Sequence, residues 1–181
     1  GSTAAQQRNQ VRQAEDGRYF VEIEEDILDG VPREEWASTV RQNLKEKFPN
    51  GVTVGKDLIR INAKSRGELT KSKYTKMLER TAPDTYADKM RATNNLDELL
   101  QTANDWTGET ATHSRKDNLV GFTRGNVLLR VGENEYSADV LVGETRGGGL
   151  ELYDIVGIQP AKIDEKKTAS KGQAAANTLV P

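Results

Sequence analysis

The spacing of hydrophobic residues changes along the chain, and each spacing predicts a different element. In residues 18–25 apolar side chains alternate with charged ones, which predicts a strand with one buried face. From Trp36 to Phe48 an apolar residue recurs at every fourth position, which predicts a helix with one apolar face. Two short apolar runs around a Gly-Lys-Asp turn, in residues 52–62, predict a hairpin.

Helical spacing dominates the middle of the chain. A serine and a glutamate three residues apart form a capping-box pattern, so a helix is expected from Ser65 to about Arg80. A weaker helix is expected over residues 84–92, after a proline. A stronger helix is expected over residues 94–106, with an asparagine as its cap and Gly108 as its end.

Beyond residue 118 the apolar residues recur at every second position. Three alternating segments, residues 122–131, 136–145 and 150–158, are separated by short glycine-containing links. This arrangement predicts an antiparallel three-stranded meander. The predicted fold class is α+β, with helices packed on an antiparallel sheet that ends in this C-terminal meander.

Both ends of the chain are poor in large apolar residues. We expect a flexible N-terminal tail over residues 1–17, a single α+β domain over residues 18–163 and a disordered C-terminal tail over residues 164–181. No apolar run approaches the roughly 18 residues that a membrane-spanning helix needs, and no signal-peptide pattern is present. No membrane partner is therefore expected.

Charge is distributed unevenly although the net charge is only −2. Residues 15–35 carry nine acidic and two basic side chains, whereas residues 60–91 carry nine basic and four acidic ones. Such a polarised surface can receive the phosphates of a nucleic acid on its basic side. The candidate nucleic-acid-binding patch comprises Lys64, Arg66, Lys71, Lys73 and Lys76. The alternative is that the two charged blocks face each other or are merely solvated.

The chain has one histidine and no cysteine, which excludes disulfides, thiolate metal sites and cysteine nucleophiles. Neither a metal nor another cofactor is expected. The histidine, His113, lies in a polar segment and is followed by Arg115 and Lys116. A lone histidine is more often structural or idle than catalytic, but metal-independent RNA cleavage suits this composition. The ribose 2′-hydroxyl attacks its own phosphate, so the protein need supply only a proton-transfer group and cations.

Other residues of the same region are candidates for binding the phosphate. Arg124 and Arg130 lie on the first strand of the predicted meander, and Arg146 precedes its glycine-rich link. Together with Lys116 they can stabilise the extra negative charge on a reacting phosphate. The hydroxyl group of Ser137, on the second strand, can orient the phosphate or act as an acid.

Part of the chain, roughly residues 95–158, resembles the large polyvalent protein-associated domains of phages and conjugative elements. The resemblance lies in the stretches LDELLQTANDW, THSRKDN and NVLLRVGENEYSADVLVGETRGGGLELYDIVGI. These domains are similar to the barnase–EndoU–colicin–RelE group of ribonuclease folds, in which helices pack on a small antiparallel sheet. The resemblance implies that His113 is the general acid or base, that Arg115 contacts phosphate and that Tyr153 supplies a hydroxyl near the groove. A buried aromatic side chain explains Tyr153 equally well.

These observations lead to competing hypotheses about function. The first is a metal-independent endoribonuclease-like domain, of the toxin or effector type, within a polyvalent protein of a phage or mobile element. The alternative is a non-catalytic module of the same fold that binds nucleic acid or protein, and an unrelated structural or packaging-associated domain is a third candidate. The expected partners are RNA, with transfer RNA among the candidates, a cognate inhibitor protein and the rest of a larger polypeptide. The expected location is the cytoplasm of a bacterial host.

Overall fold

The computed structural model describes residues 10–110 and 118–166 of the chain. Its strands are β1 (Val11–Gln13), β2 (Tyr19–Ile23), β3 (Val52–Val54), β4 (Asp57–Arg60), β5 (Asn104–Thr110), β6 (Leu119–Val131), β7 (Asn134–Thr145) and β8 (Leu150–Pro160). Its helices are α2 (Trp36–Lys47), α3 (Ala63–Lys71), α4 (Lys73–Thr81), α5 (Pro83–Ala92) and α6 (Leu96–Thr102), with the 3₁₀ turns η1 (Arg33–Glu35) and η2 (Thr93–Asn95). The predicted α+β class is confirmed.

The strands form one sheet in the order β1-β2-β6-β7-β8-β4-β3, and β5 also pairs with β6. The predicted meander is present as β6, β7 and β8, which pair antiparallel in sequence order. The expectation of an antiparallel sheet is wrong in one respect, because β2 pairs with β6 in parallel, and so does β4 with β8. The sheet is therefore mixed. In both parallel pairs a crossover that contains helices separates the two strands, as parallel pairing requires.

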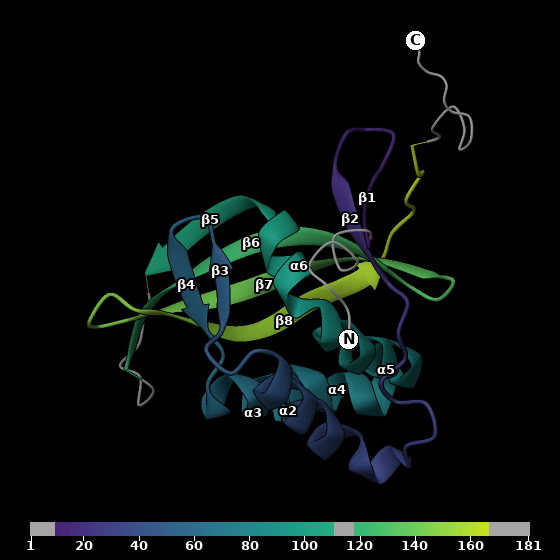
Figure 1. The fold of residues 1–181 in the computed structure, drawn as a ribbon, viewed down its shortest axis with the longest axis horizontal. Helices are drawn as coiled ribbons and strands as arrows, with labels where there is room; N and C mark the ends of the chain where they lie inside the picture. The colour runs from purple at the N-terminus through teal and green to yellow at the C-terminus, as the bar shows by residue number, and fades with distance from the viewer. Residues whose placement is uncertain (1–9, 111–117, 167–181) are drawn as a thin grey trace.

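The helices α2, α3, α4 and α5 lie together on one side of the sheet (Figure 1). The main core forms between this layer and the inner face of the strands, where Val127, Leu129 and Val140 are almost completely buried. The apolar stripe predicted on the first helix is confirmed, since Val40 and Leu44 of α2 have no exposed surface. Burial of this stripe provides the hydrophobic stabilisation that joins the helices to the sheet.

The helix expected from Ser65 to about Arg80 is two helices. The side chain of Asn62 accepts a hydrogen bond from the Ser65 amide at 2.9 Å, and the Ser65 hydroxyl accepts one from the Asn62 amide at 3.3 Å. Asn62 is thus the N-cap of α3, and Ser65 is the third residue within it. Ser72 interrupts the helix in an extended conformation and caps α4. The capping box exists, but one turn earlier than predicted.

Three other expectations are corrected, one at the end of a helix and two in the predicted tails. The predicted helix over residues 94–106 ends at Thr102, and the following residues form β5, which pairs antiparallel with β6. Residues 11–13, expected in a flexible tail, form β1 against β2. The first described residues after 163, expected in a disordered tail, also have partners, because Glu165 forms a β-bridge with Ala14.

A second, smaller apolar cluster lies apart from the main core. It consists of Ala14, Phe20, Leu128 and Ile163, with Ala161 packed against it. Leu128 and Phe20 alternate with residues of the main core along β6 and β2, so this cluster lies on the other face of the sheet. The segment after β8 therefore covers one end of the face that the helices leave open.

Candidate functional site

The segment with the predicted catalytic histidine begins and ends at one end of the sheet. His113, Arg115 and Lys116 lie outside the described residues. The flanking residues are placed: Thr110 ends β5, and Asn118 immediately precedes β6. Asn118 accepts two hydrogen bonds from Arg146, from its backbone amide at 3.3 Å and from its Nε at 3.4 Å. Arg146, a predicted phosphate ligand, thus lies beside the end of the histidine segment.

Four predicted residues project from the face of the meander opposite the helices. They are Arg124 and Arg130 on β6, Ser137 on β7 and Tyr153 on β8. The sequence neighbours of Arg130 and Ser137 are buried in the main core, and successive side chains of a strand point to opposite faces. Arg124 is an even number of residues from Arg130 on β6, so it shares this face. We call this surface of β6, β7 and β8 the open face. The alternation of apolar and polar residues is sufficient to predict it.

A network of hydrogen bonds connects the polar side chains of the open face. The guanidinium of Arg124 is 2.9 Å from the Asp139 carboxylate. Asn126 donates to the hydroxyl oxygen of Ser137 at 3.0 Å and to Asp139 at 3.2 Å. Asn126 and Asp139 were not predicted as site residues, although their strand positions share a face with Arg124 and Ser137. That common face was the signal that could have identified them.

Arg130 is held more firmly than Arg124. It is within 2.9 Å of Glu135, 3.2 Å of Glu165 and 3.6 Å of Glu22, and its guanidinium lies 4.8 Å from the centre of the Phe20 ring. Only 18% of its side chain is exposed, compared with 41% for Arg124. Three carboxylates already neutralise Arg130, so Arg124 is the more accessible of the two cations.

Tyr153 occupies an irregular position in β8. Leu141 of β7 pairs with Asp154 and Val142 pairs with Leu152, so β8 contains one extra residue between these pairs, which is Tyr153. Such β-bulges reorient a side chain and occur frequently beside active sites. The Tyr153 ring meets the ring of Phe122 edge-on, with 5.1 Å between their centres and 75° between their planes.

The sequence of the chain matches one known family. Residues 33–153 match the model of a family described as large polyvalent protein-associated domain 3. The chain belongs to this family. No curated protein and no solved structure matched the chain. The predicted resemblance to polyvalent protein-associated domains is confirmed, and the chain is a domain of the kind found in larger polyvalent proteins of phages or mobile elements.

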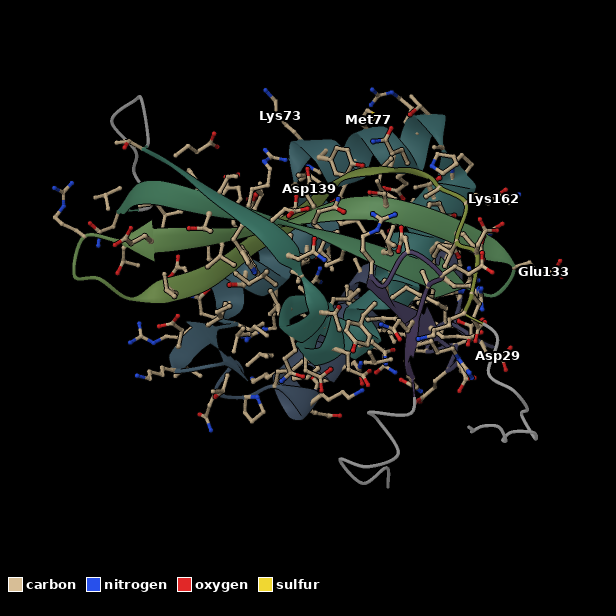
Figure 2. All side chains as sticks on the ribbon, turned by 90° about the horizontal axis from the view of Figure 1, so that it is seen from above. Asp29, Lys73, Met77, Glu133, Asp139 and Lys162 are labelled. Carbon is tan, nitrogen blue, oxygen red and sulfur yellow. The ribbon has the colours of Figure 1, made fainter. Side chains whose placement is uncertain are left out.

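The family match extends from η1 to Tyr153, so it includes the helices that carry the predicted basic patch. Lys71, Lys73 and Lys76 are exposed, and Lys73 projects outward from α4 in Figure 2. The other two members are engaged with their neighbours: Lys64 lies 2.8 Å from Glu151, and Arg66 donates to a backbone carbonyl at 3.1 Å. The patch accessible to a ligand is therefore concentrated on the three lysines around the start of α4.

Four residues of the acidic block, Glu22, Glu24, Glu25 and Asp26, line one cavity of about 690 Å³. Its other charged lining residues are Asp88, Glu133 and Arg91. Arg91 contacts both Asp26, at 3.0 Å, and Asp88, at 2.9 Å. The acidic and basic blocks thus meet at this arginine, while the three exposed lysines belong to α3 and α4.

One member of the basic block is not on the surface. The side chain of Lys89 is 0% exposed and lies 2.7 Å from the Asp154 carboxylate. Lys89 also donates to the Thr75 hydroxyl at 2.6 Å, and Ser72 donates to Asp154 at 2.7 Å. Burial lowers the pKa of Lys89, and the charge of Asp154 opposes this effect. The cluster joins α4 and α5 to β8 directly beside Tyr153.

The described ranges contain neither a group of metal ligands nor a helix that could span a membrane. Among residues 10–110 and 118–166, no three or more histidine, cysteine, aspartate or glutamate side chains are grouped as a metal site would require. None of the helices in these ranges has the length and apolar character needed to cross a membrane.

Proposed function

We propose that this domain is a metal-independent endoribonuclease whose RNA substrate crosses the open face, with His113 as the general acid or base. The observation that carries the proposal is the common location of Arg124, Ser137 and Tyr153 on one partly exposed sheet face. The segment with His113 starts and ends at the edge of the same face, where Arg146 lies. A rigid sheet that presents catalytic groups beside a loop is a common arrangement in enzymes.

The proposed reaction uses a nucleophile that the substrate itself provides. His113 accepts the proton of a ribose 2′-hydroxyl, whose oxygen attacks the adjacent phosphorus atom. The bond from phosphorus to the 5′-oxygen breaks, and that oxygen receives a proton from an acid, for which the Tyr153 hydroxyl is the candidate. The products are a 2′,3′-cyclic phosphate and a 5′-hydroxyl end. Arg115, Lys116 and Arg124 would stabilise the charge that develops on the phosphate.

Arg124 is suited to exchange its present partner for a phosphate. Its pairing with Asp139 is partly exposed to solvent, and an ion pair of this kind contributes at most about 1 kcal/mol. A phosphate can accept two parallel hydrogen bonds from one guanidinium. Arg130, by contrast, would have to leave three carboxylates and an aromatic ring. We therefore assign phosphate contact to Arg124 and a structural role to Arg130.

The test is cleavage of single-stranded RNA and transfer RNA with a chelator present, at a pH of about 6 to 8. We expect 2′,3′-cyclic phosphate ends and no cleavage of DNA, which lacks the 2′-hydroxyl. His113→Ala should lower the rate by about 10²–10⁴-fold, the usual contribution of one general acid or base, without changing the unfolding temperature. Arg115→Ala should reduce the rate more than it reduces RNA affinity. Absence of cleavage, or full activity in His113→Ala, would exclude the enzyme.

A specific observation favours a non-catalytic nucleic-acid-binding module as the second candidate. Both strand arginines of the open face are paired with carboxylates, which lowers the positive charge available for phosphate. In that case RNA would bind mainly through Lys71, Lys73 and Lys76. Changing these three residues to glutamate should weaken binding to every sequence and reduce its dependence on salt, because fewer counterions are released.

A domain that cleaves RNA in the cytoplasm would also require a cognate inhibitor protein. Co-expression of the domain with candidate inhibitor proteins can identify this partner, because the inhibitor should restore growth.

A further inference from the structure

We propose that Phe122 and Tyr153 form a subsite that stacks one unpaired nucleobase of single-stranded RNA, next to the phosphate assigned to Arg124. The proposal rests on the proposed function and names its substrate, RNA that is single-stranded at the point of contact. It also separates two possible roles of Tyr153. The aromatic ring would bind a base, whether or not the hydroxyl group takes part in catalysis.

The two rings are not used to build the core of the protein. Phe122 and Tyr153 are both half-buried, and neither belongs to the main core or to the smaller cluster around Phe20. They contact each other edge-to-face, a favourable geometry that fixes the orientation of both rings. Proteins that bind single-stranded nucleic acid commonly display such aromatic side chains on a sheet, and successive bases stack on them.

Buried groups on the helix side of the sheet fix the position of Tyr153. The two residues beside it, Leu152 and Asp154, are 1% and 2% exposed, and Asp154 is bonded to Lys89 and Ser72 at 2.7 Å each. The bulge in β8 then directs the intervening side chain to the open face. A ring held in this way loses little conformational freedom when a base binds, which favours affinity.

The surroundings of the rings fit a nucleotide better than a protein partner. Arg124 lies two positions from Phe122 on the same face of β6, and Asp139 and Asn126 provide further polar groups beside it. A protein interface of useful affinity has an extended apolar centre. The exposed large hydrophobic residues in the described ranges are Tyr19, Leu58 and Trp106, which lie on β2, β4 and β5 instead.

Duplex RNA is not expected to use this subsite. In an A-form helix the bases are already stacked and paired, and proteins reach mainly the backbone and the shallow groove. Only an unpaired base can leave its neighbours and lie against an aromatic ring. The subsite should therefore distinguish single-stranded from double-stranded RNA, whereas the lysines of α3 and α4 should not.

The test measures RNA binding by fluorescence anisotropy in the full chain with His113→Ala, so that the probe stays intact. Tyr153→Leu and Phe122→Leu keep apolar volume but remove one ring each, and each should weaken binding of a short single-stranded RNA by roughly 5- to 100-fold, the contribution of one stacked base. Tyr153→Phe restores the ring and should restore affinity. Tyr19→Leu, which removes an exposed ring of β2, is the matched control and should bind as the parent does.

A spectroscopic measurement distinguishes the loss of a stacking ring from a folding defect in the variants. In the His113→Ala chain, the ring protons of Phe122 and Tyr153 should shift when single-stranded RNA is added and should stay unchanged with a blunt-ended duplex. Unshifted rings at saturating single-stranded RNA, or unchanged affinity in a folded Tyr153→Leu variant, would overturn the subsite. If the protein cleaves RNA and neither ring affects the reaction, the proposed function stands and the subsite is excluded. If binding depends on the rings but no RNA is cleaved, the subsite stands and the nuclease activity is excluded. If no RNA is bound, both proposals are excluded.

Discussion

The two faces of the meander carry their polar residues in different ways. On the covered face, Asp154 of β8 pairs with Lys89 of α5, both are almost fully buried, and each has at least two hydrogen-bonding partners within the protein. On the open face, Arg124 and Asp139 form one pair whose side chains remain 41% and 27% exposed. The same kind of ion pair therefore stands in two environments that differ in their access to water.

This difference decides which polar groups can serve function. A buried charge that loses its partner cannot be compensated by water, so its removal is expensive. An exposed pair can exchange one partner for water or a phosphate at little cost. We therefore expect substitution of a buried charge with several partners to change the free energy of unfolding, and substitution of a partly exposed pair such as Arg124 and Asp139 to change ligand binding.

Lys89→Met should have the largest effect on stability. It leaves the Asp154 carboxylate buried without its cation, and breaking a buried pair in this way costs about 3–5 kcal/mol. Chemical denaturation monitored by circular dichroism measures the free energy of unfolding. Adding Asp154→Asn to Lys89→Met removes the unpaired charge and should recover at least about 1 kcal/mol. A loss under about 1 kcal/mol in Lys89→Met would show that water reaches the cluster.

Trp36→Ala should cost about 3 kcal/mol, the lower end of the range for large aromatic residues, because Trp36 is only partly buried. Its ring stacks on Tyr86 with 6.0 Å between centres, and its indole nitrogen donates to the Val31 carbonyl at 2.9 Å. The matched control is Tyr19→Ala, which removes a ring that is 52% exposed and should cost less than about 1 kcal/mol. Equal losses in thermal unfolding would contradict the assignment of Trp36 to the core.

Elements with a regular local pattern could be predicted from the sequence. The stripe of α2 and the three strands of the meander follow from periods of about four and two residues. Strand β1 could not be predicted, because its three residues gain stability from partners distant in the sequence, β2 and the segment around Glu165. Residues 104–110 form strand β5 because they pair with β6, although the helical pattern of the preceding residues continues into this segment.

The candidate site was predictable in its parts but not in its connections. Alternation along the strands was enough to place Arg124 and Ser137 on one face. It could not show that three carboxylates, from separate segments, surround Arg130. Nor could it show the bulge at Tyr153, which depends on the pairing of two strands. Lys89 was counted among surface bases because a composition count does not register burial.

Glu98→Gln should have an intermediate effect that depends on pH. Glu98 is 3% exposed, and its Oε2 has no hydrogen-bonding partner among the described residues. Burial raises the pKa of Glu98 above its ordinary value of 4.5, although a hydrogen bond from Asn95 opposes the shift. The folded state thus prefers the protonated acid, so this contribution to stability is present below about pH 4.5 and is lost as pH rises through the folded pKa.

The glutamine variant carries no charge at any pH and avoids this loss. Relative to the parent chain it should be more stable at neutral pH, by about 1 kcal/mol, and the difference should disappear as pH falls towards about 4. Thermal unfolding of both proteins across this range measures the effect. A constant difference at every pH would mean that Glu98 does not titrate with folding.

Arg124→Gln should have the smallest effect on stability, within about 0.5 kcal/mol, because it removes a single pair that water can replace. Arg130→Gln is the matched control on the same strand and face. It loses three carboxylate contacts and the ring of Phe20, so it should destabilise the protein more, by about 1–2 kcal/mol. RNA affinity should respond in the reverse order, because the side chain of Arg124 is more exposed than that of Arg130. If Arg130→Gln weakened RNA binding more than Arg124→Gln while both stayed folded, the phosphate contact would belong to Arg130, and exposure would not be the property that separates functional from structural charges on this sheet.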